Sequence, residues 1–202
     1  MFLTVLDHIG VFFFAISGLL TAGERNLDLL GGYIIAYITA LGGGTIRDLL
    51  LNVDVAWMSS VSITLTVFVG ATVGLVFRNK LKRLRKTFFI FDTLGIAFFT
   101  IVGTQKALAY DQIPFTAMFL GMITATFGGL IRDVLCNEIP LIFRKEIYAI
   151  PCLSGAAVYL LGDYLGFAGD AWLLLTGVTI IIAVRTLAVT RSWKMPLIKE
   201  LD

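Results

Sequence analysis

A ten-residue motif occurs twice in this chain, and its two copies lie 85 residues apart. The first copy is GGTIRDLLLN at residues 43–52, and the second is GGLIRDVLCN at residues 128–137. Seven of the ten positions are identical, and the same offset relates Asp7 to Asp92. Chance matching of common residues does not keep a constant offset, so the sequence indicates an internal duplication.

The composition is that of a protein surrounded by lipid. Of the 202 residues, 58% are hydrophobic and only 15% are charged, and the mean hydropathy is +0.91. An ordinary soluble domain is about 45–50% apolar and about 25% charged. A soluble fold of this size could not keep so much apolar surface from water, so we expect an integral membrane protein. The formal net charge of +2 is too small to indicate a nucleic-acid partner.

Seven stretches are long and apolar enough to cross a bilayer, which takes about 20 residues. They are residues 2–22, 29–50, 56–77, 88–109, 113–136, 147–163 and 171–190. Each copy of the duplicated unit contains three of them, and this odd number forces the second copy to enter the membrane from the opposite side. We therefore predict an all-α membrane protein with two inverted three-helix repeats, an architecture shared by many transport proteins. Residues 1–202 would form one membrane domain, in which the repeats cover about 1–78 and 86–163 and the helix at 171–190 is additional.

The distribution of basic residues predicts the orientation of the chain in the membrane. Residues 78–86 hold six of the sixteen lysines and arginines, and short loops rich in these residues stay in the cytoplasm. Alternating outward from this loop places the N-terminus outside and the C-terminus in the cytoplasm.

Runs of glycine interrupt the second and the fifth apolar stretch. The residues are Gly42, Gly43, Gly44, Gly128 and Gly129. Each costs a helix roughly 1 kcal/mol relative to alanine, so the runs favour a kink or local unwinding beside protein or a water-filled cavity. The exposed carbonyls would then bind cations together with the hydroxyl of Thr45. The alternative is close packing of helices through small residues, which is also the role that we predict for Gly70 and Gly74 of the third stretch.

Charged residues inside the apolar stretches are functional candidates, because a charge in the membrane must be paired or hydrated. The set is Asp7, Arg47, Asp48, Asp92, Arg132 and Asp133. Neighbouring residues point about 100° apart on a helix, so we expect the arginine and the aspartate of one motif to have different partners. The topology brings Asp7 towards Arg47 near the outer surface and brings Asp92 towards Arg132 near the inner surface. This predicts two symmetric ion pairs; the alternative is that the charges sit at the lipid headgroups as helix ends.

Little else in the sequence indicates chemistry. We interpret Lys106 and Arg185 as cations that snorkel towards the membrane surface. The chain has one histidine and neither HExxH nor GxSxG, so we expect no enzyme, no cofactor and no specific metal site. A potassium-filter sequence TVGYG is also absent, so a channel built from this chain would have modest selectivity.

The doubled motif resembles that of prokaryotic members of the trimeric intracellular cation channel (TRIC) family. The resemblance rests on GGGTIRD at 42–48, on FGGLIRD at 127–133 and on the three-plus-three-plus-one arrangement of apolar stretches. It implies a homotrimer in the inner membrane of a prokaryotic cell, with membrane lipids as partners and with a bound lipid as a further ligand. It also implies a pore inside each protomer, kinks at the glycine runs, and permeation of monovalent cations, chiefly potassium. Phe127 stands where the first copy has Gly42, which implies a milder kink in the fifth helix.

Bacterial relatives with this doubled unit have also been classed as glycine transporters. A secondary transporter of a small amino acid such as glycine is therefore the alternative function, and the inverted repeat supports both functions equally. Such a transporter would hold the carboxylate of a zwitterion at a half-helix N-terminus and its amine at Asp48 or Asp133.

Overall fold

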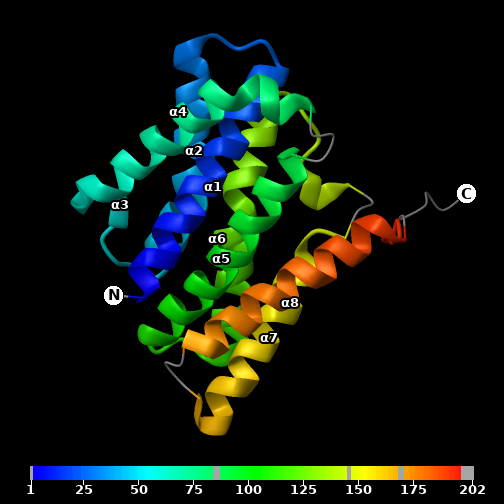
Figure 1. Ribbon diagram of the computed structural model, residues 1–202. Coiled ribbons are helices and arrows are strands. Elements are labelled where there is room, and N and C mark those ends of the chain that lie inside the picture. Colours follow the sequence, from blue (N-terminus) through cyan, green and yellow to red (C-terminus); the bar gives the residue numbers. More distant parts are fainter. Residues whose placement is uncertain (1, 84–86, 145–146, 168–170, 197–202) are drawn as a thin grey trace, which may run out of the picture.

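The computed structural model describes residues 2–83, 87–144, 147–167 and 171–196 (Figure 1). Seven helices within these residues are long and apolar enough to cross a membrane, as the sequence predicts. They are α1 (Phe2–Glu24), α2 (Leu29–Leu50), α4 (Val61–Arg83), α5 (Thr87–Ala109), α6 (Pro114–Leu135), α7 (Ala149–Gly162) with the π-helical turn η2 (Asp163–Phe167), and α8 (Ala171–Thr190). The described residues contain no strand, so the predicted all-α class is confirmed.

The third predicted stretch, 56–77, is divided into two helices. A short helix, α3 (Ala56–Ser59), precedes α4, and Ser60 between them has extended backbone angles of φ −128° and ψ 103°. The sixth predicted stretch, 147–163, begins two residues later as α7 and continues through η2. A glycine with a positive φ of 94°, Gly166, lies in that turn and breaks the helical path.

The repeated asparagine of the motif ends α2 and α6 in the same way. Asn52 and Asn137 both have left-handed backbone angles, with φ of 53° and 56°, a conformation that asparagine adopts more readily than most residues. The amide of Val53 then donates to the carbonyl of Asp48 at 3.0 Å, and the equivalent bond after α6 measures 2.8 Å. This return bond satisfies a carbonyl that the helix end leaves free, so both helices stop at equivalent residues.

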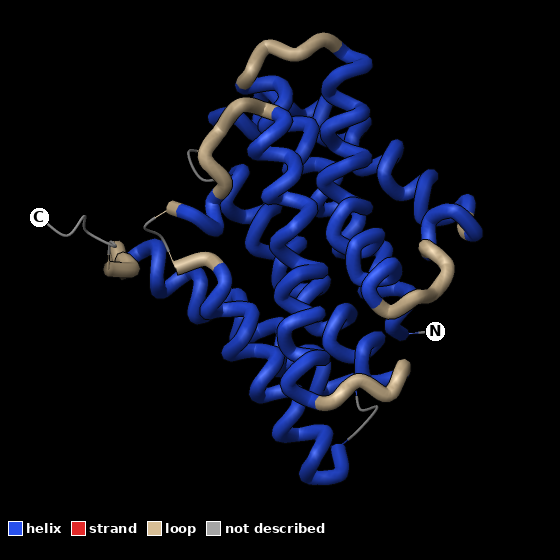
Figure 2. The backbone as a smooth tube through the Cα atoms, turned by 180° about the vertical axis from the view of Figure 1, so that it is seen from behind, coloured by secondary structure: helices blue, strands red, loops and turns tan. Residues whose placement is uncertain are grey.

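Four helices, α1, α2, α5 and α6, form the centre of the protein (Figure 1). On one side α4 packs on α1, and on the other side α7 and α8 pack together and against α5. Figure 2 shows the same bundle from behind, with the loops at the helix ends. The second half therefore departs from the first by the additional helix α8, which shares with α7 the contact with α5.

The two halves pack against each other through equivalent residues. Gly10 of α1 lies against the ring of Phe99 of α5, and Gly95 of α5 lies against the ring of Phe14 of α1. The two phenylalanines are themselves 85 residues apart, and their ring centroids are separated by 5.2 Å. Because a later residue of α1 meets an earlier residue of α5, these two equivalent helices run antiparallel.

The helices α2 and α6 cross at the glycine runs in the same reciprocal way. A Cβ atom on Gly43 would overlap the carbonyl oxygen of Thr124, and one on Gly128 would overlap the carbonyl oxygen of Thr39. Both helices continue through these glycines as α-helix, so the predicted local unwinding is wrong. The glycines instead let two helix backbones approach closely, which is the alternative that the sequence left open.

The glycines of the third stretch also lie at a helix contact. A Cβ on Gly70 of α4 would come within 2.8 Å of the carbonyl oxygen of Phe12 in α1. One on Gly74 would come within 3.2 Å of the side chain of Leu19. Both glycines therefore allow α4 to pack closely on α1 within the same chain.

Candidate functional site

Four charged side chains gather at the C-terminal end of α2, and four gather at the C-terminal end of α6. The α2 cluster consists of Asp7, Arg47, Asp48 and Lys106, and the α6 cluster consists of Asp92, Arg132, Asp133 and Arg185. Three members of each cluster are related by the 85-residue offset, and the fourth is not. Each cluster has two carboxylates and two cations, so its formal charges sum to zero. This balance lowers the cost of placing the charges inside a membrane.

The α6 cluster is a closed network of ion pairs. Arg132 donates from Nη1 to Asp92 Oδ1 at 3.2 Å and from Nε to Asp133 Oδ1 at 2.8 Å. The same Nη1 also donates to the hydroxyl of Ser17 on α1 at 2.9 Å. Arg185 donates from Nη2 to the second oxygen of Asp92 at 3.1 Å. The predicted Asp92–Arg132 ion pair is therefore present, and Arg185 joins it inside the protein instead of snorkelling.

Aromatic rings cover the two arginines of the α6 cluster. The guanidinium of Arg132 lies 4.7 Å from the ring centroid of Phe88. That of Arg185 lies 5.3 Å from the ring of Phe89 and 4.4 Å from the ring of Tyr148. The side chains of both arginines are at most 2% exposed. Desolvated guanidinium–ring contacts of this kind hold a cation in place by about 2 kcal/mol.

The α2 cluster pairs its charges differently from our prediction. Arg47 donates from Nε to Oδ1 of its neighbour Asp48 at 2.7 Å, and Lys106 donates to the same oxygen at 2.8 Å. Both Asp7 and Arg47 line one hollow, but no ion pair within 4.0 Å joins these two described residues. The prediction that neighbours on a helix have different partners is thus wrong. It considered only the direction of the Cβ atoms, whereas an arginine side chain is long enough to fold back onto the next residue.

The aspartate of each motif also holds the segment that follows its helix. Asp48 Oδ2 accepts from the amide of Ala56 at 3.1 Å, at the start of α3. Asp133 Oδ2 accepts from the amide of Leu141 at 3.0 Å, at the start of the short 3-10 helix η1 (Leu141–Phe143). Both oxygens of each carboxylate therefore have donors from this chain, which explains why the motif keeps aspartate in both copies.

A small hollow extends from the α2 cluster towards the middle of the bundle. It has a volume of about 20 Å³, enough for about one water molecule. Asp7, Thr45 and Trp57 line it, and Phe99 lines its inner part. The hydroxyl of Thr45 accepts from the indole of Trp57 at 2.9 Å and donates to the carbonyl of Leu41 at 2.8 Å. The hollow is thus polar at the cluster and aromatic at the level where the two halves meet.

One face of α5 connects the two clusters. Asp92 belongs to the α6 cluster, Phe99 to the central aromatic pair, and Lys106 to the α2 cluster. Successive members are seven residues apart, so they lie on one side of the helix, and the outer two are separated by about 21 Å along its axis. The charged groups, the hollow and the aromatic pair therefore form one column through the centre of the protein.

Some buried donors of the α6 cluster have no partner in the protein. They are Arg132 Nη2, Arg185 Nη1 and the hydroxyl of Tyr148. A Cβ on Gly129 would lie 3.1 Å from the Tyr148 oxygen and 3.4 Å from Arg132 Nη2, so this glycine leaves space beside two of them. An unsatisfied buried donor costs about 1–3 kcal/mol, which indicates that water reaches this cluster.

The sequence predictions omitted several members of the column. Arg185 and Lys106 were interpreted as snorkelling cations because neither belongs to the repeated motif. Ser17, Trp57 and Tyr148 carry no charge, and nothing in their sequence context distinguishes them from other polar residues of apolar helices. A charge in the second half of an apolar stretch was the one available signal for Arg185.

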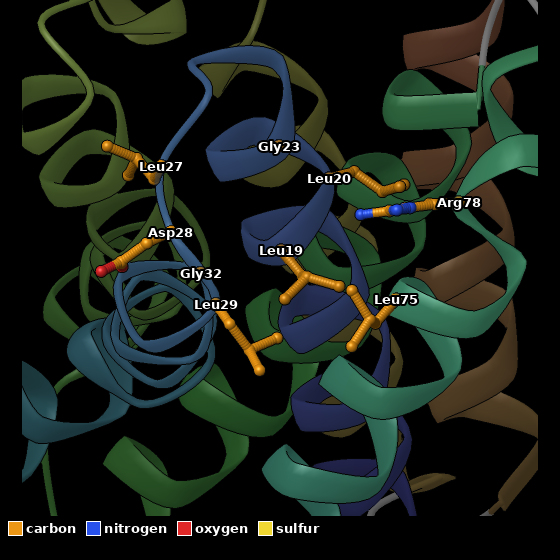
Figure 3. A pocket seen from close by; sticks show the side chains of 9 residues that line it. All are labelled: Leu19, Leu20, Gly23, Leu27, Asp28, Leu29, Gly32, Leu75 and Arg78. Carbon is orange, nitrogen blue, oxygen red and sulfur yellow. The ribbon is translucent and has the colours of Figure 1, made fainter.

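A second, larger pocket lies near the surface, between the end of α1, the start of α2 and α4 (Figure 3). Its volume is about 320 Å³, and leucine side chains form much of its wall. Arg78 extends across it, whereas the carboxylate of Asp28 turns away to accept from the amide of Gly31 and cap α2 (Figure 3). Arg78 has no ion pair among the described residues. Of the basic segment 78–86, its side chain alone is described, and the rest lie outside the described residues.

Comparisons with known proteins cover almost the whole chain. A family model described as "Glycine transporter" matches residues 4–79 and again residues 89–164, so its second match begins 85 residues after the first. The inner membrane protein YadS of Escherichia coli K12 is 35% identical over 193 residues, which is 95% of this chain and 93% of YadS.

Two solved structures resemble this protein closely. One comes from work on conductance through TRIC cation channels; it has a TM-score of 0.87 at 32% identity and covers 98% of both chains. The TRIC orthologue from Rhodobacter sphaeroides has a TM-score of 0.88 at 31% identity, over 94% of this chain and 98% of that one. The likeness includes both halves and the additional helix, and the chain therefore belongs to the TRIC family of membrane proteins, whose sequence model bears the glycine-transporter description.

Proposed function

We propose that this protein is a potassium-permeable channel for monovalent cations and that each protomer of a homotrimer contains its own pore. The observation that carries the proposal is the central column, in which two neutral charge clusters lie on opposite sides of the Phe14–Phe99 pair and the glycine crossing. Both solved relatives are described as TRIC channels, and the Rhodobacter protein is described as trimeric. The resemblance supports a channel rather than an enzyme.

The reciprocal contacts support an inverted repeat as the basis of the pore. Equivalent helices run antiparallel where they meet, and the overlap of Gly43 with Thr124 is matched by that of Gly128 with Thr39. A two-fold axis in the membrane plane would exchange these contacts, and transport proteins place the substrate path at such an interface. The basic segment supports an orientation with the N-terminus outside and the C-terminus in the cytoplasm.

The permeation path would be lined by carboxylates, hydroxyls and aromatic rings. Cations would pass the α2 cluster, the hollow beside Thr45, the phenylalanine pair and the α6 cluster in turn. A passage between aromatic rings opens or closes by wetting. Because no ring of backbone carbonyls replaces the hydration shell, selectivity among monovalent cations would be modest.

Glycine transport is less well supported. The description of the family model favours it, but the carboxylates that would receive the amine are engaged by this chain. Asp48 accepts from Arg47, Lys106 and an amide, and Asp133 accepts from Arg132 and an amide. An incoming ammonium group would have to displace these donors.

Lipid would bind at the larger pocket. An apolar wall and one unpaired guanidinium suit an acyl chain and the phosphate of a phospholipid, because arginine binds phosphate by paired hydrogen bonds. This proposal gives the expected lipid ligand a location on the surface, outside the central column.

Planar-bilayer recording from purified protein, beside glycine uptake into liposomes, tests the function. Unitary potassium currents well above about 10⁵ ions per second would exclude alternating access, because conformational cycles take microseconds to milliseconds or longer. Saturable glycine uptake coupled to an ion, without unitary currents, would refute the channel.

A further inference from the structure

The two charge clusters reach the same balance by different means. Their shared members are an arginine and two aspartates, and each cluster then needs one more cation. The α6 cluster takes Arg185 from α8, which lies outside the repeat. The α2 cluster takes Lys106 from α5, and the residue equivalent to Lys106 in the first half is Thr21, whose hydroxyl donates to a carbonyl of its own helix at 3.0 Å.

These two cations differ in how firmly they are held. Arg185 is fixed by Asp92, by the hydroxyl of Thr93 at 3.1 Å and by the ring of Tyr148, and its side chain is 2% exposed. The side chain of Lys106 is 25% exposed, and its ammonium has one partner among the described residues, Asp48. A flexible stem with a compact ammonium is easily displaced, whereas a stacked guanidinium is not.

The ammonium of Lys106 occupies a position that would suit a free cation. Without it, the cluster would hold Asp7 and Asp48 against Arg47 alone, an excess of one negative charge beside a water-sized polar hollow. Carboxylate, hydroxyl and water oxygens are the ligands that hard cations prefer. Lys106 is also the most exposed member of its ion pairs and covers Asp48, whose side chain is 1% exposed.

We propose that Lys106 is a tethered cation that competes with permeating cations for Asp48 and thereby restrains entry at the α2 end of the pore. The inference rests on the proposed channel function and adds a regulatory residue to it. Potassium would enter when its concentration or the applied voltage displaces the ammonium, which would then move into the water at the mouth.

Single-channel recording of charge variants tests the inference. Lys106→Met removes the charge and keeps most of the length, and we expect a several-fold larger mean current than in the wild type. Lys106→Arg keeps the charge and should not raise the current. Lys194→Met removes an exposed cation of the C-terminal segment, so it controls for the loss of one charge elsewhere.

The potassium dependence separates competition from simple repulsion. At constant ionic strength, with N-methylglucamine replacing potassium, the wild-type current should rise more steeply with potassium than the Lys106→Met current. Parallel concentration curves for the two proteins would overturn the competition. So would a Lys106→Met current equal to or below that of a conducting wild type.

A chemical test avoids any dependence on how the methionine variant folds. Lys106→Cys in an assembled, conducting channel can be modified with methanethiosulfonate ethylammonium, which restores a positive charge, or with the neutral methyl reagent. We expect the charged reagent to reduce the current, dithiothreitol to restore it, and the neutral reagent to leave it high. Equal effects of both reagents would overturn the inference, and an absence of currents from every variant and from the wild type would refute the channel function itself.

Discussion

Gly43 of α2 lies so close to the carbonyl oxygen of Thr124 in α6 that no side chain fits between the two helices. We expect Gly43→Ala to push the helices apart and to lower stability by about 1–3 kcal/mol, the usual cost of overpacking. Gly44→Ala is the matched control, because a Cβ there would meet only Arg47 Nη2 at 3.8 Å. Thermal unfolding of both variants in detergent measures the difference. A loss of stability equal in the two would show that helix propensity, and not the crossing, is responsible.

The balance of the α6 cluster predicts a strong coupling between Asp92 and Arg185. Arg185→Leu leaves Asp92 and Asp133 facing Arg132 alone, and Asp92→Asn leaves two arginines facing one aspartate. Each single change should cost about 3–5 kcal/mol, because it leaves a buried charge without compensation. The double variant restores neutrality and should cost clearly less than the sum. A double-mutant cycle from reversible unfolding measures this, and additive costs would contradict the network.

The larger pocket predicts that Arg78 retains phospholipid through purification. Arg78→Gln removes the cation and should reduce the amount of bound phospholipid, because the phosphate loses its guanidinium. Native mass spectrometry of protein in mild detergent counts the retained lipids. The control is Arg191→Gln, since Arg191 is an exposed cation at the end of α8. Equal retention in wild type and in both variants would remove the pocket as a lipid site.

The native cysteines should not interfere with thiol chemistry at Lys106→Cys. Burial raises the pKa of the Cys136 thiol, so less of the reactive thiolate is present at any given pH. Cys152 is wholly buried in α7. Wild-type protein at pH 8 should therefore take up methanethiosulfonate reagents slowly when folded and rapidly once it is unfolded. Intact-protein mass spectrometry follows the two rates, and fast modification of the folded wild type would contradict the burial.

The repeat, the membrane spans and the pairing of Asp92 with Arg132 were all accessible from the residues alone. Spans follow from hydropathy because lipid selects apolar side chains along a whole helix. The constant offset of 85 residues indicated which positions are equivalent, and the reciprocal contacts of Gly10 with Phe99 and of Gly95 with Phe14 agree with it. Three helices per copy are enough to predict that equivalent helices meet in opposite directions.

The partners of the long side chains depended on the three-dimensional arrangement. Arg47 chose the neighbouring Asp48 over Asp7, and Lys106 and Arg185 entered clusters to which no motif assigns them. An arginine or lysine spans several ångströms on rotatable bonds, so its contacts depend on which other helices surround it. The glycine runs show the same limit. Glycine permits both an unwound helix and a close crossing, and only the packing of α2 on α6 decided that they form a crossing.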